Sequence, residues 1–192
     1  ADGSSWLDLC AGPGGKAALL SSIARQRGIK FTANEISAAR AELVGQVVHG
    51  DRVLVLDGRT IGSLPEKFDA ILIDAPCTGL GALRRRPEVR WRRTLQDLRA
   101  LTQLQRELVD SAIEALNPGG VLGYATCSPH LAETSIQIAD IKKKYSELQQ
   151  VSVDEYLPVS LQDATRDGAM SLWTHKHGTD AMYLALFRKD IG

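Results

Sequence analysis

The stretch Phe68-Asp-Ala-Ile-Leu-Ile-Asp-Ala-Pro-Cys77 decides the fold of this chain. Its first six residues form a mostly apolar run of the length of a buried strand, and a carboxylate, a proline and a thiol follow directly. Ligands of open α/β sheets bind in the crevice beyond the carboxyl ends of the strands, so Asp74 and Cys77 are candidates for chemistry. The same residues also occur in a plain turn that ends a strand, with a small buried cysteine.

Strand and helix patterns alternate on both sides of this stretch. Strands are expected at 6–9, 30–34, 52–56, 68–73 and 121–125, and helices at 17–27, about 37–44, 94–116 and about 132–145. This alternation predicts right-handed crossovers and a mostly parallel sheet. A weak strand at 148–153, a polar irregular stretch to Lys176 and a final strand at 181–187 should follow, the last one antiparallel. We therefore predict an α/β fold with a doubly wound, mostly parallel seven-stranded sheet, of the Rossmann-like class I methyltransferase type.

Length and composition indicate one soluble globular domain over residues 1–192. The chain is 44% hydrophobic and 24% charged, and no apolar stretch approaches the ~20 residues needed to span a bilayer. Its three cysteines include no C-x-x-C pair, which argues against a disulfide framework and a zinc site. We expect a cytoplasmic monomer with no metal and no membrane association. The abrupt start just before a strand predicts the C-terminal part of a longer protein.

Charge is unevenly distributed although the net charge is zero. Residues 84–93 hold six arginines and one glutamate, with Trp91 among them. Such a block can contact phosphates and stack on bases, which favours a nucleic-acid partner. A solvated basic loop is the alternative.

The segment Leu7-Asp-Leu-Cys-Ala-Gly-Pro-Gly-Gly-Lys16 places a glycine-rich turn between a strand and a helix. Glycine lets the backbone approach a ligand closely, and a helix N-terminus offers unpaired N–H groups. The third glycine of the dinucleotide pattern G-x-G-x-x-G is missing, so the turn suits S-adenosylmethionine better than a pyrophosphate. A glycine turn alone can also be purely structural.

Two acids follow later strands and strengthen this interpretation. Glu35 lies 23 residues after Gly12, where a carboxylate can accept hydrogen bonds from both ribose hydroxyls. Asp57 ends the third expected strand, where it can meet the adenine amino group. The alternatives are a solvated acid at a helix start for Glu35 and a turn aspartate for Asp57.

Two thiols follow the fourth and fifth expected strands. Cys77 and Cys127 are 50 residues apart in sequence, but these strands should be neighbours in the sheet, so both sulfurs can face one pocket. Either cysteine alone could be a small buried hydrophobic residue. Two thiols at adjacent strand ends favour catalysis.

Five motifs together resemble the RNA cytosine-5 methyltransferases of the Sun/NOL1/NOP2 family, and in particular its bacterial members that act on 16S ribosomal RNA. They are LDLCAGPGGK (7–16), DGR (57–59), DAPCTGLGALRRRPEVRW (74–91), ATCS (125–128) and HGTDAMYLALFRK (177–189). The resemblance implies cytosine-C5 methylation of ribosomal RNA with S-adenosyl-L-methionine, which becomes S-adenosyl-L-homocysteine. It further implies that an N-terminal RNA-binding domain, and a helix that helps enclose the cofactor, lie outside this chain.

The resemblance also implies residue roles. Cys127 would be the nucleophile that forms a covalent Cys–C6 adduct, Cys77 would help release the product, and Asp74 would lie near the base. The cofactor contacts would be Cys10, Ala11, Gly12, Pro13, Gly14, Gly15, Lys16, Glu35, Asp57 and Asp74. Two departures from the family pattern are Glu35, where Asp is commoner, and Cys-Ala-Gly in place of Cys-Ala-Ala.

The chemistry explains why two thiols are needed. Cytosine C5 is a weak nucleophile, and a thiolate added at C6 makes it enamine-like. A base must then remove the C5 proton before the thiolate can leave. The alternative is a non-catalytic RNA- or ribosome-binding module on the same fold, which the abrupt start and neutral charge would suit. A nicotinamide oxidoreductase fits neither the glycine pattern nor the thiols.

Overall fold

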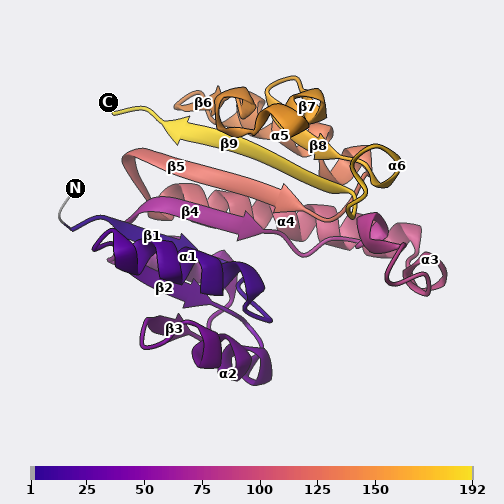
Figure 1. Cartoon of the computed structure of the whole chain (residues 1–192). Coiled ribbons are helices and arrows are strands. Elements are labelled where there is room, and N and C mark those ends of the chain that lie inside the picture. The colour runs from indigo at the N-terminus through magenta and orange to yellow at the C-terminus, as the bar shows by residue number, and fades with distance from the viewer. Residues whose placement is uncertain (1–2, 192) are drawn as a thin grey trace. The chain divides into compact units, whose positions relative to one another are not determined.

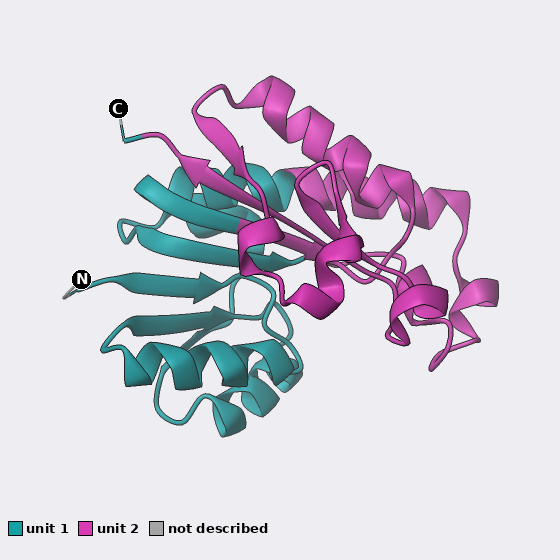
Figure 2. Ribbon diagram, turned by 45° about the horizontal axis from the view of Figure 1, so that its top comes forward, with its two compact units in different colours: residues 1–74, 107–122, 191–192 teal, residues 75–106, 123–190 magenta. Residues whose placement is uncertain are grey.

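The computed structural model describes residues 3–191. Its strands are β1 (Ser5–Asp8), β2 (Lys30–Asn34), β3 (Arg52–Leu54), β4 (Phe68–Asp74), β5 (Leu116–Thr126), β6 (Leu148–Val151), β7 (Thr165–Arg166), β8 (Ala169–Leu172) and β9 (Met182–Lys189) (Figure 1). Its α-helices are α1 (Gly15–Gln26), α2 (Ala38–Val47), α3 (Val89–Arg92), α4 (Leu95–Ala115), α5 (Ser135–Lys144) and α6 (Thr174–His177). The chain divides into two compact units (Figure 2). Unit 1 comprises residues 1–74, 107–122 and 191–192, and unit 2 comprises residues 75–106 and 123–190.

Unit 1 contains the parallel part of the sheet. The strand order is β3-β2-β1-β4, and β5 follows β4. The β1–β2, β1–β4 and β2–β3 pairs are parallel, with Trp6 opposite both Phe31 and Ala70. The carboxyl ends of β1, β2 and β4 therefore lie at one edge, where the residues that follow Asp8, Asn34 and Ile73 can meet.

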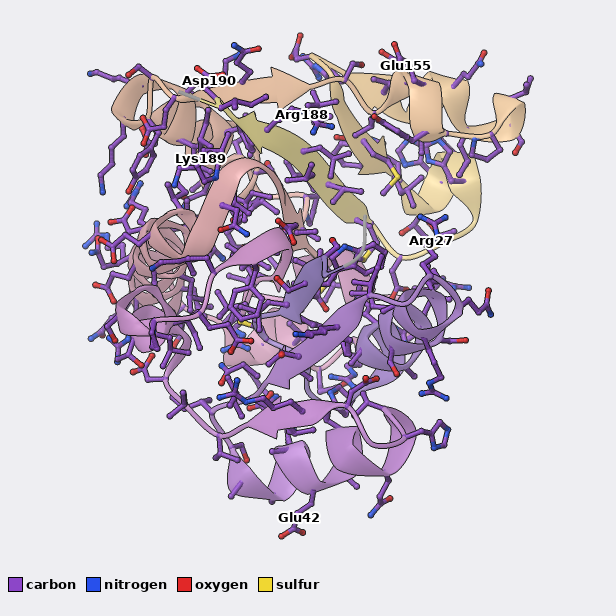
Figure 3. The ribbon with its side chains drawn as sticks, turned by 90° about the vertical axis from the view of Figure 1, so that its left-hand side faces the viewer. Arg27, Glu42, Glu155, Arg188, Lys189 and Asp190 are labelled. Atoms are coloured by element: carbon purple, nitrogen blue, oxygen red, sulfur yellow. The ribbon has the colours of Figure 1, made fainter. Side chains whose placement is uncertain are left out.

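Helix α1 packs closely on this part of the sheet because its inner face is built from small residues. Ala17 and Ala24 are fully buried in a cluster with Phe31 and Val44. The helix follows Gly14, which has φ 116°, and a Cβ there would lie 2.7 Å from a methyl group of Val47. Only glycine fits this position without strain. Charged side chains on the solvent face of the helices point outward, as Glu42 of α2 does in Figure 3.

Unit 2 contains the antiparallel strands. Strand β9 pairs with β6 and with β8, and β8 pairs with β7 in a short hairpin. Alternate residues of β9 are buried, among them Tyr183, Ala185 and Phe187, as expected for a strand with one face on a core. Strand β5 precedes β9 in the strand order and has residues in both units.

The predicted fold class and mostly parallel sheet are confirmed, and an antiparallel strand lies near the C-terminus as expected. The predicted count of seven strands is wrong, because the described residues form nine. The stretch expected to be irregular before Lys176 contains the β7–β8 hairpin. Its turn is Asp167-Gly168, with φ 53° and 75°, and two positive φ angles match the hairpin turn that Asp-Gly favours. The Asp-Gly dipeptide is therefore the sequence signal that predicts this hairpin. A single domain over residues 1–192 stays a prediction.

Within residues 3–191, every helix is too short or too polar to cross a lipid bilayer.

Candidate functional site

The glycine-rich turn between β1 and α1 approaches the end of β2. The backbone N–H of Gly12 donates to Oε2 of Glu35 at 3.1 Å, and a Cβ on Gly12 would lie 2.2 Å from that oxygen. The next residues, Pro13, Gly14 and Gly15, lead into α1, whose first turn has no side-chain cap. Backbone N–H groups at the start of this helix are therefore available to a ligand.

Glu35 is buried, with 3% of its surface exposed, so the solvated-acid interpretation is wrong. Its carboxylate accepts hydrogen bonds from the backbone of Gly12, from the backbone of Ser37 at 2.9 Å and from Arg40 at 2.7 Å. A carboxylate offers about four acceptor positions, and these three bonds leave room for another donor. The arrangement fixes the carboxylate beside the glycine turn, and its contact with a ribose stays a prediction.

Asp57 has a structural role that the turn interpretation anticipated. Its carboxylate accepts from the backbone N–H of Arg59 at 3.0 Å and pairs with the guanidinium of the same residue. These hydrogen bonds from Arg59 hold the pKa of Asp57 below its ordinary value. A contact with an adenine would have to share this carboxylate with Arg59.

Asp74, the last residue of β4, pairs with Lys16 at the start of α1 through a 2.7 Å ion pair. This contact joins two predicted site residues that are 58 positions apart in sequence. Both side chains are partly exposed, so the pair can exchange partners with a ligand.

Asp8 is a site residue that the sequence reasoning missed. It is completely buried at the end of β1, and among the described residues neither carboxylate oxygen has a hydrogen-bond partner. Burial, followed by the nearby Asp74 carboxylate, raises the pKa of Asp8 to about 7. An acid within the apolar run 6–9 was the available signal, because a buried carboxyl usually needs a partner.

Cys10 lies in the same turn, beside Ala11, and forms no part of the thiol pair. Burial, followed by the Asp8 carboxylate, raises the pKa of Cys10 to about 12. This thiol stays protonated at neutral pH, so it is suited to packing rather than to nucleophilic attack.

The two later thiols meet within unit 2. Sγ of Cys77 lies 3.3 Å from Sγ of Cys127, so the predicted proximity is confirmed. The hydrogen bond to Cys127, followed by burial, raises the pKa of Cys77. The two sulfurs therefore share one environment, in which a charge on either disfavours a charge on the other.

Backbone contacts join the loops that carry these thiols. The N–H of Gly81 donates to the carbonyl of Cys127 at 2.9 Å, and the hydroxyls of Thr78 and Ser128 lie 3.3 Å apart. A Cβ on Gly81 would lie 2.0 Å from the carbonyl oxygen of Ala181 and 2.7 Å from that of Cys127. The two loops are thus packed directly against each other, and this close packing requires glycine at position 81.

Glu133 holds the Cys77 loop through hydrogen bonds. The sequence patterns did not predict this role. It is completely buried, and its carboxylate accepts from the backbone N–H of Thr78 at 2.8 Å and from Gln105 at 3.2 Å. Gln105 also donates to the carbonyl of Pro76 at 2.9 Å. The residues on both sides of Cys77 are therefore held by this network. No sequence signal distinguished Glu133 from a surface acid.

The arginine block has both structural and exposed members. Arg85 pairs with Asp180, and Arg93 donates to the carbonyl of Thr78 at 3.1 Å, next to Cys77. Trp91 is 82% exposed, with the guanidinium of Arg90 5.6 Å from its ring. Part of the block thus anchors the loop, and the rest faces solvent.

Among residues 3–191, no group of three or more His, Cys, Asp and Glu side chains is placed to hold a metal ion.

The profile of the family described as 16S rRNA methyltransferase RsmB/F matches residues 1–188. The chain belongs to this family.

Relatives of the RsmB/F family extend well beyond the length of this chain. Protein Rv1407 of Mycobacterium tuberculosis is 50% identical over 98% of the chain. The ribosomal RNA small subunit methyltransferase B of Shewanella oneidensis is 34% identical and the methyltransferase F of Serratia proteamaculans 32% identical, each over 95% of the chain. The chain spans about two fifths of these relatives, covering 41%, 42% and 40% of their lengths.

Solved structures of similar proteins share the fold. NSun6 from Pyrococcus horikoshii, crystallised with SFG, matches 98% of this chain with a TM-score of 0.83 and 26% identity, over 48% of its own length. A methyltransferase homologue from the same organism matches 98% of this chain with a TM-score of 0.77 and 26% identity, over 62% of its length.

Proposed function

We propose that this chain is the catalytic domain of an S-adenosylmethionine-dependent RNA cytosine-C5 methyltransferase that acts on ribosomal RNA, most simply 16S ribosomal RNA. The observation that carries the proposal is the 3.3 Å approach of Cys77 and Cys127 in a chain of the RsmB/F family. Packing alone does not require two thiols to lie in contact. A cytosine-C5 mechanism uses one as nucleophile and the other as acid–base group.

The residues of unit 1 fit the cofactor. Asp8 has a buried carboxylate without a partner, and an ammonium group such as that of a bound amino acid would supply one. Gly12 and Gly14 keep the turn free of side chains, while Glu35 keeps an acceptor position for a hydroxyl. We infer that the cofactor is held by these residues together with the start of α1, Lys16 and Asp74. When bound, S-adenosylmethionine supplies an electrophilic methyl group.

The thiols divide the remaining work. The Cys127 thiolate adds to C6 of cytosine, forming a C–S bond while electron density moves to C5 and to the N3 side of the ring. Asp74 would stabilise that side through a hydrogen bond. After C5 carries its methyl group, Cys77 removes the C5 proton, the electron pair returns to form the C5–C6 double bond, and the C–S bond breaks. Cys127 leaves as a thiolate.

The contact of the two sulfurs suits one thiol as nucleophile and the other as base, and the roles of Cys127 and Cys77 follow the family resemblance. A thiolate on Cys127 raises the pKa of Cys77, so Cys77 holds its proton during attack. Once Cys127 is bonded to carbon, its charge is gone and the largest cause of that rise disappears. Cys77 can then lose its own proton to solvent and, as a thiolate, accept the C5 proton.

Chain connectivity links this chemistry to unit 1. Asp74 and Cys77 are three positions apart, so their Cα atoms are within about 11 Å whatever the conformation of the loop. The carboxylate paired with Lys16 and the thiol that meets Cys127 therefore belong to one short segment.

The test is a pair of cysteine variants of the full-length protein, assayed for methyl transfer to unmodified 16S ribosomal RNA. Cys127→Ala should abolish transfer, and Cys77→Ala should accumulate a covalent RNA–protein adduct on a denaturing gel. Glu155→Ala, at an exposed residue outside the predicted site residues, is the control and should retain transfer. An adduct that requires Cys77 and survives loss of Cys127 would reverse the roles. Absence of both transfer and cofactor binding by calorimetry would favour a non-catalytic RNA-binding module.

A further inference from the structure

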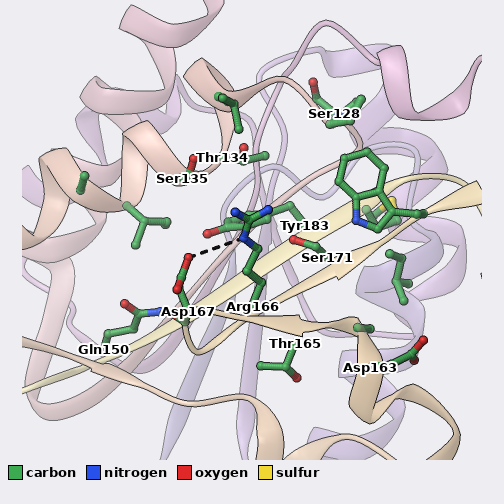
Figure 4. Close-up of a pocket in the computed structure, with 18 of the residues that line it drawn as sticks. Ser128, Thr134, Ser135, Gln150, Asp163, Thr165, Arg166, Asp167, Ser171 and Tyr183 are labelled. Carbon is green, nitrogen blue, oxygen red and sulfur yellow. Dashed lines mark hydrogen bonds and ion pairs between the residues drawn. The ribbon is translucent and has the colours of Figure 1, made fainter. Parts of the chain in front are cut away.

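Unit 2 contains a cavity of about 1000 Å³ that the proposed reaction does not use. Its lining comes from α5, from the β7–β8 hairpin and from residues around α6, and Figure 4 shows part of it. Its lining includes Ser128, the residue directly after Cys127. One lining residue is therefore next in sequence to the proposed nucleophile.

Basic side chains predominate in the lining. The lining has four basic residues, Lys142, Lys143, Arg166 and Lys176, and only two acids, Asp163 and Asp167. The net charge of the whole protein is zero, so this part of the surface is more basic than the average. Arg166 and Asp167 form a 3.8 Å ion pair, but their side chains are 85% and 91% exposed. An ion pair this exposed contributes little, so Arg166 can exchange it for a phosphate. In Figure 4 the Arg166 guanidinium projects among the other lining side chains.

An aromatic side chain and hydroxyl groups complete the lining. Trp173 is 39% exposed and lines the cavity, so part of its ring is accessible to a ligand. Thr134, Ser135 and Ser171 add hydroxyls that can donate to or accept from a sugar or base edge. A positive groove with an exposed aromatic ring is the combination that binds single-stranded nucleic acid.

We propose that this cavity binds the single-stranded RNA segment adjoining the target cytosine, with phosphates on its lysines and Arg166 and a base stacked on Trp173. The proposal rests on the proposed function, because it takes the ligand of the cavity to be the substrate RNA. The volume lies at the upper end for ligand pockets and has room for about one or two nucleotides.

Photocrosslinking tests the stacking contact. A single-stranded RNA carrying 5-bromouridine beside the target cytosine is irradiated with the full-length protein, and the joined peptides are identified by mass spectrometry. The expected crosslink falls on the peptide that contains Trp173. Crosslinks confined to other segments, such as 84–93, would overturn the proposal.

Equilibrium binding to the same RNA, measured by fluorescence anisotropy without cofactor, provides the quantitative arm. Trp173→Ala should weaken binding about 5- to 150-fold, the range for loss of one stacked base, and Trp173→Phe should restore most of it. Tyr156→Ala removes a 62% exposed aromatic ring outside the lining and should leave the affinity unchanged. Arg166→Ala should weaken binding, while Arg27→Ala, directly after α1, should not.

Two further outcomes separate this proposal from its premises. Wild-type affinity in Trp173→Ala would overturn the cavity proposal even if methyl transfer were normal. Loss of methyl transfer in Cys127→Ala with unchanged RNA binding would leave the cavity proposal intact. A competition experiment with cytidine monophosphate completes the test. If micromolar cytidine monophosphate displaced the RNA, the cavity would be a site for free nucleotides, and the assignment to RNA would be overturned.

Discussion

Asp8 and Glu133 are both buried acids, and their surroundings give them different tasks. Asp8 lacks a hydrogen-bond partner among the described residues, whereas Glu133 accepts from Thr78 and Gln105. A carboxyl group without a partner is destabilising when charged, and a fully hydrogen-bonded one can hold a loop in place. Asp8 is thus arranged for a ligand and Glu133 for the Cys77 loop.

Asp8 should make the stability of the ligand-free protein depend on pH. Its pKa is about 7 in the folded state and near 4 in the unfolded chain, so the folded state binds more protons between these values. The free energy of unfolding should therefore fall as pH rises from about 4 to 7 and stay low above 7. Asp8→Asn should remove this slope and stabilise the protein above pH 7 by at most about 4 kcal/mol. Urea unfolding at several pH values checks it, and an unchanged slope in Asp8→Asn would contradict it.

Glu133 should act on the release step through Cys77. Glu133→Ala leaves the Thr78 N–H without its partner, and we expect a loss of about 1–3 kcal/mol in unfolding free energy. Because the loop also positions Cys77, a covalent RNA adduct should accumulate, as in Cys77→Ala. Glu133→Gln keeps an acceptor for Thr78 and should restore turnover in part. The exposed Glu155 offers the control Glu155→Ala, and adduct levels equal to wild type in Glu133→Ala would exclude this role.

At the scale of elements, the two thiol loops pack closely because Gly81 lies against the carbonyl groups of Cys127 and Ala181. A side chain at this position has no room. Gly81→Ala should force the backbone apart, separating the sulfurs and lowering methyl transfer by at least tenfold. Gly45 in α2 has open space at its Cβ, so Gly45→Ala should leave transfer unchanged and raise stability by about 0.5–1 kcal/mol. Methyl-transfer rates of the two variants, measured against the wild type, check this prediction. Near-normal transfer in Gly81→Ala would show that the loops adjust independently.

Local signals made most elements predictable, and the failures come from very short strands and from contacts between residues far apart in the sequence. The apolar run 68–73 and the glycine turn at 12–15 each have a local physical cause, so their positions were predicted closely. The β7–β8 hairpin was missed although Asp167-Gly168 signals it, because its strands are only two and four residues long. The role of Glu133 depends on a partner 55 positions away, which no pattern in sequence reveals.

At the scale of the whole molecule, zero net charge means that RNA binding depends on local groups of charge. The exposed arginines of residues 84–93 are one such group, and Arg86 and Arg92 are among them. Arg85 instead pairs with Asp180 and lowers the pKa of that acid. The block therefore combines exposed members that are free to contact phosphates with members that support the loop.

Salt dependence should separate these two kinds of arginine. Replacing Arg86 and Arg92 by alanine should weaken RNA binding and reduce the slope of log affinity against log salt by about 0.7 per lost phosphate contact. Arg85→Ala should instead lower stability, because it leaves Asp180 without its main partner. Binding titrations between 50 and 200 mM salt, with unfolding curves for each variant, check both expectations. An unchanged slope in the double variant would place the RNA elsewhere.

The assignment of the two sulfurs is tested most directly by RNA that carries 5-fluorocytidine at the target position. With fluorine at C5 there is no proton for Cys77 to remove, so the wild-type protein with S-adenosylmethionine should stay joined to the RNA. Mass spectrometry of the joined peptide should place the bond on Cys127. A bond on Cys77, or no stable adduct in a protein that methylates ordinary RNA, would contradict the account.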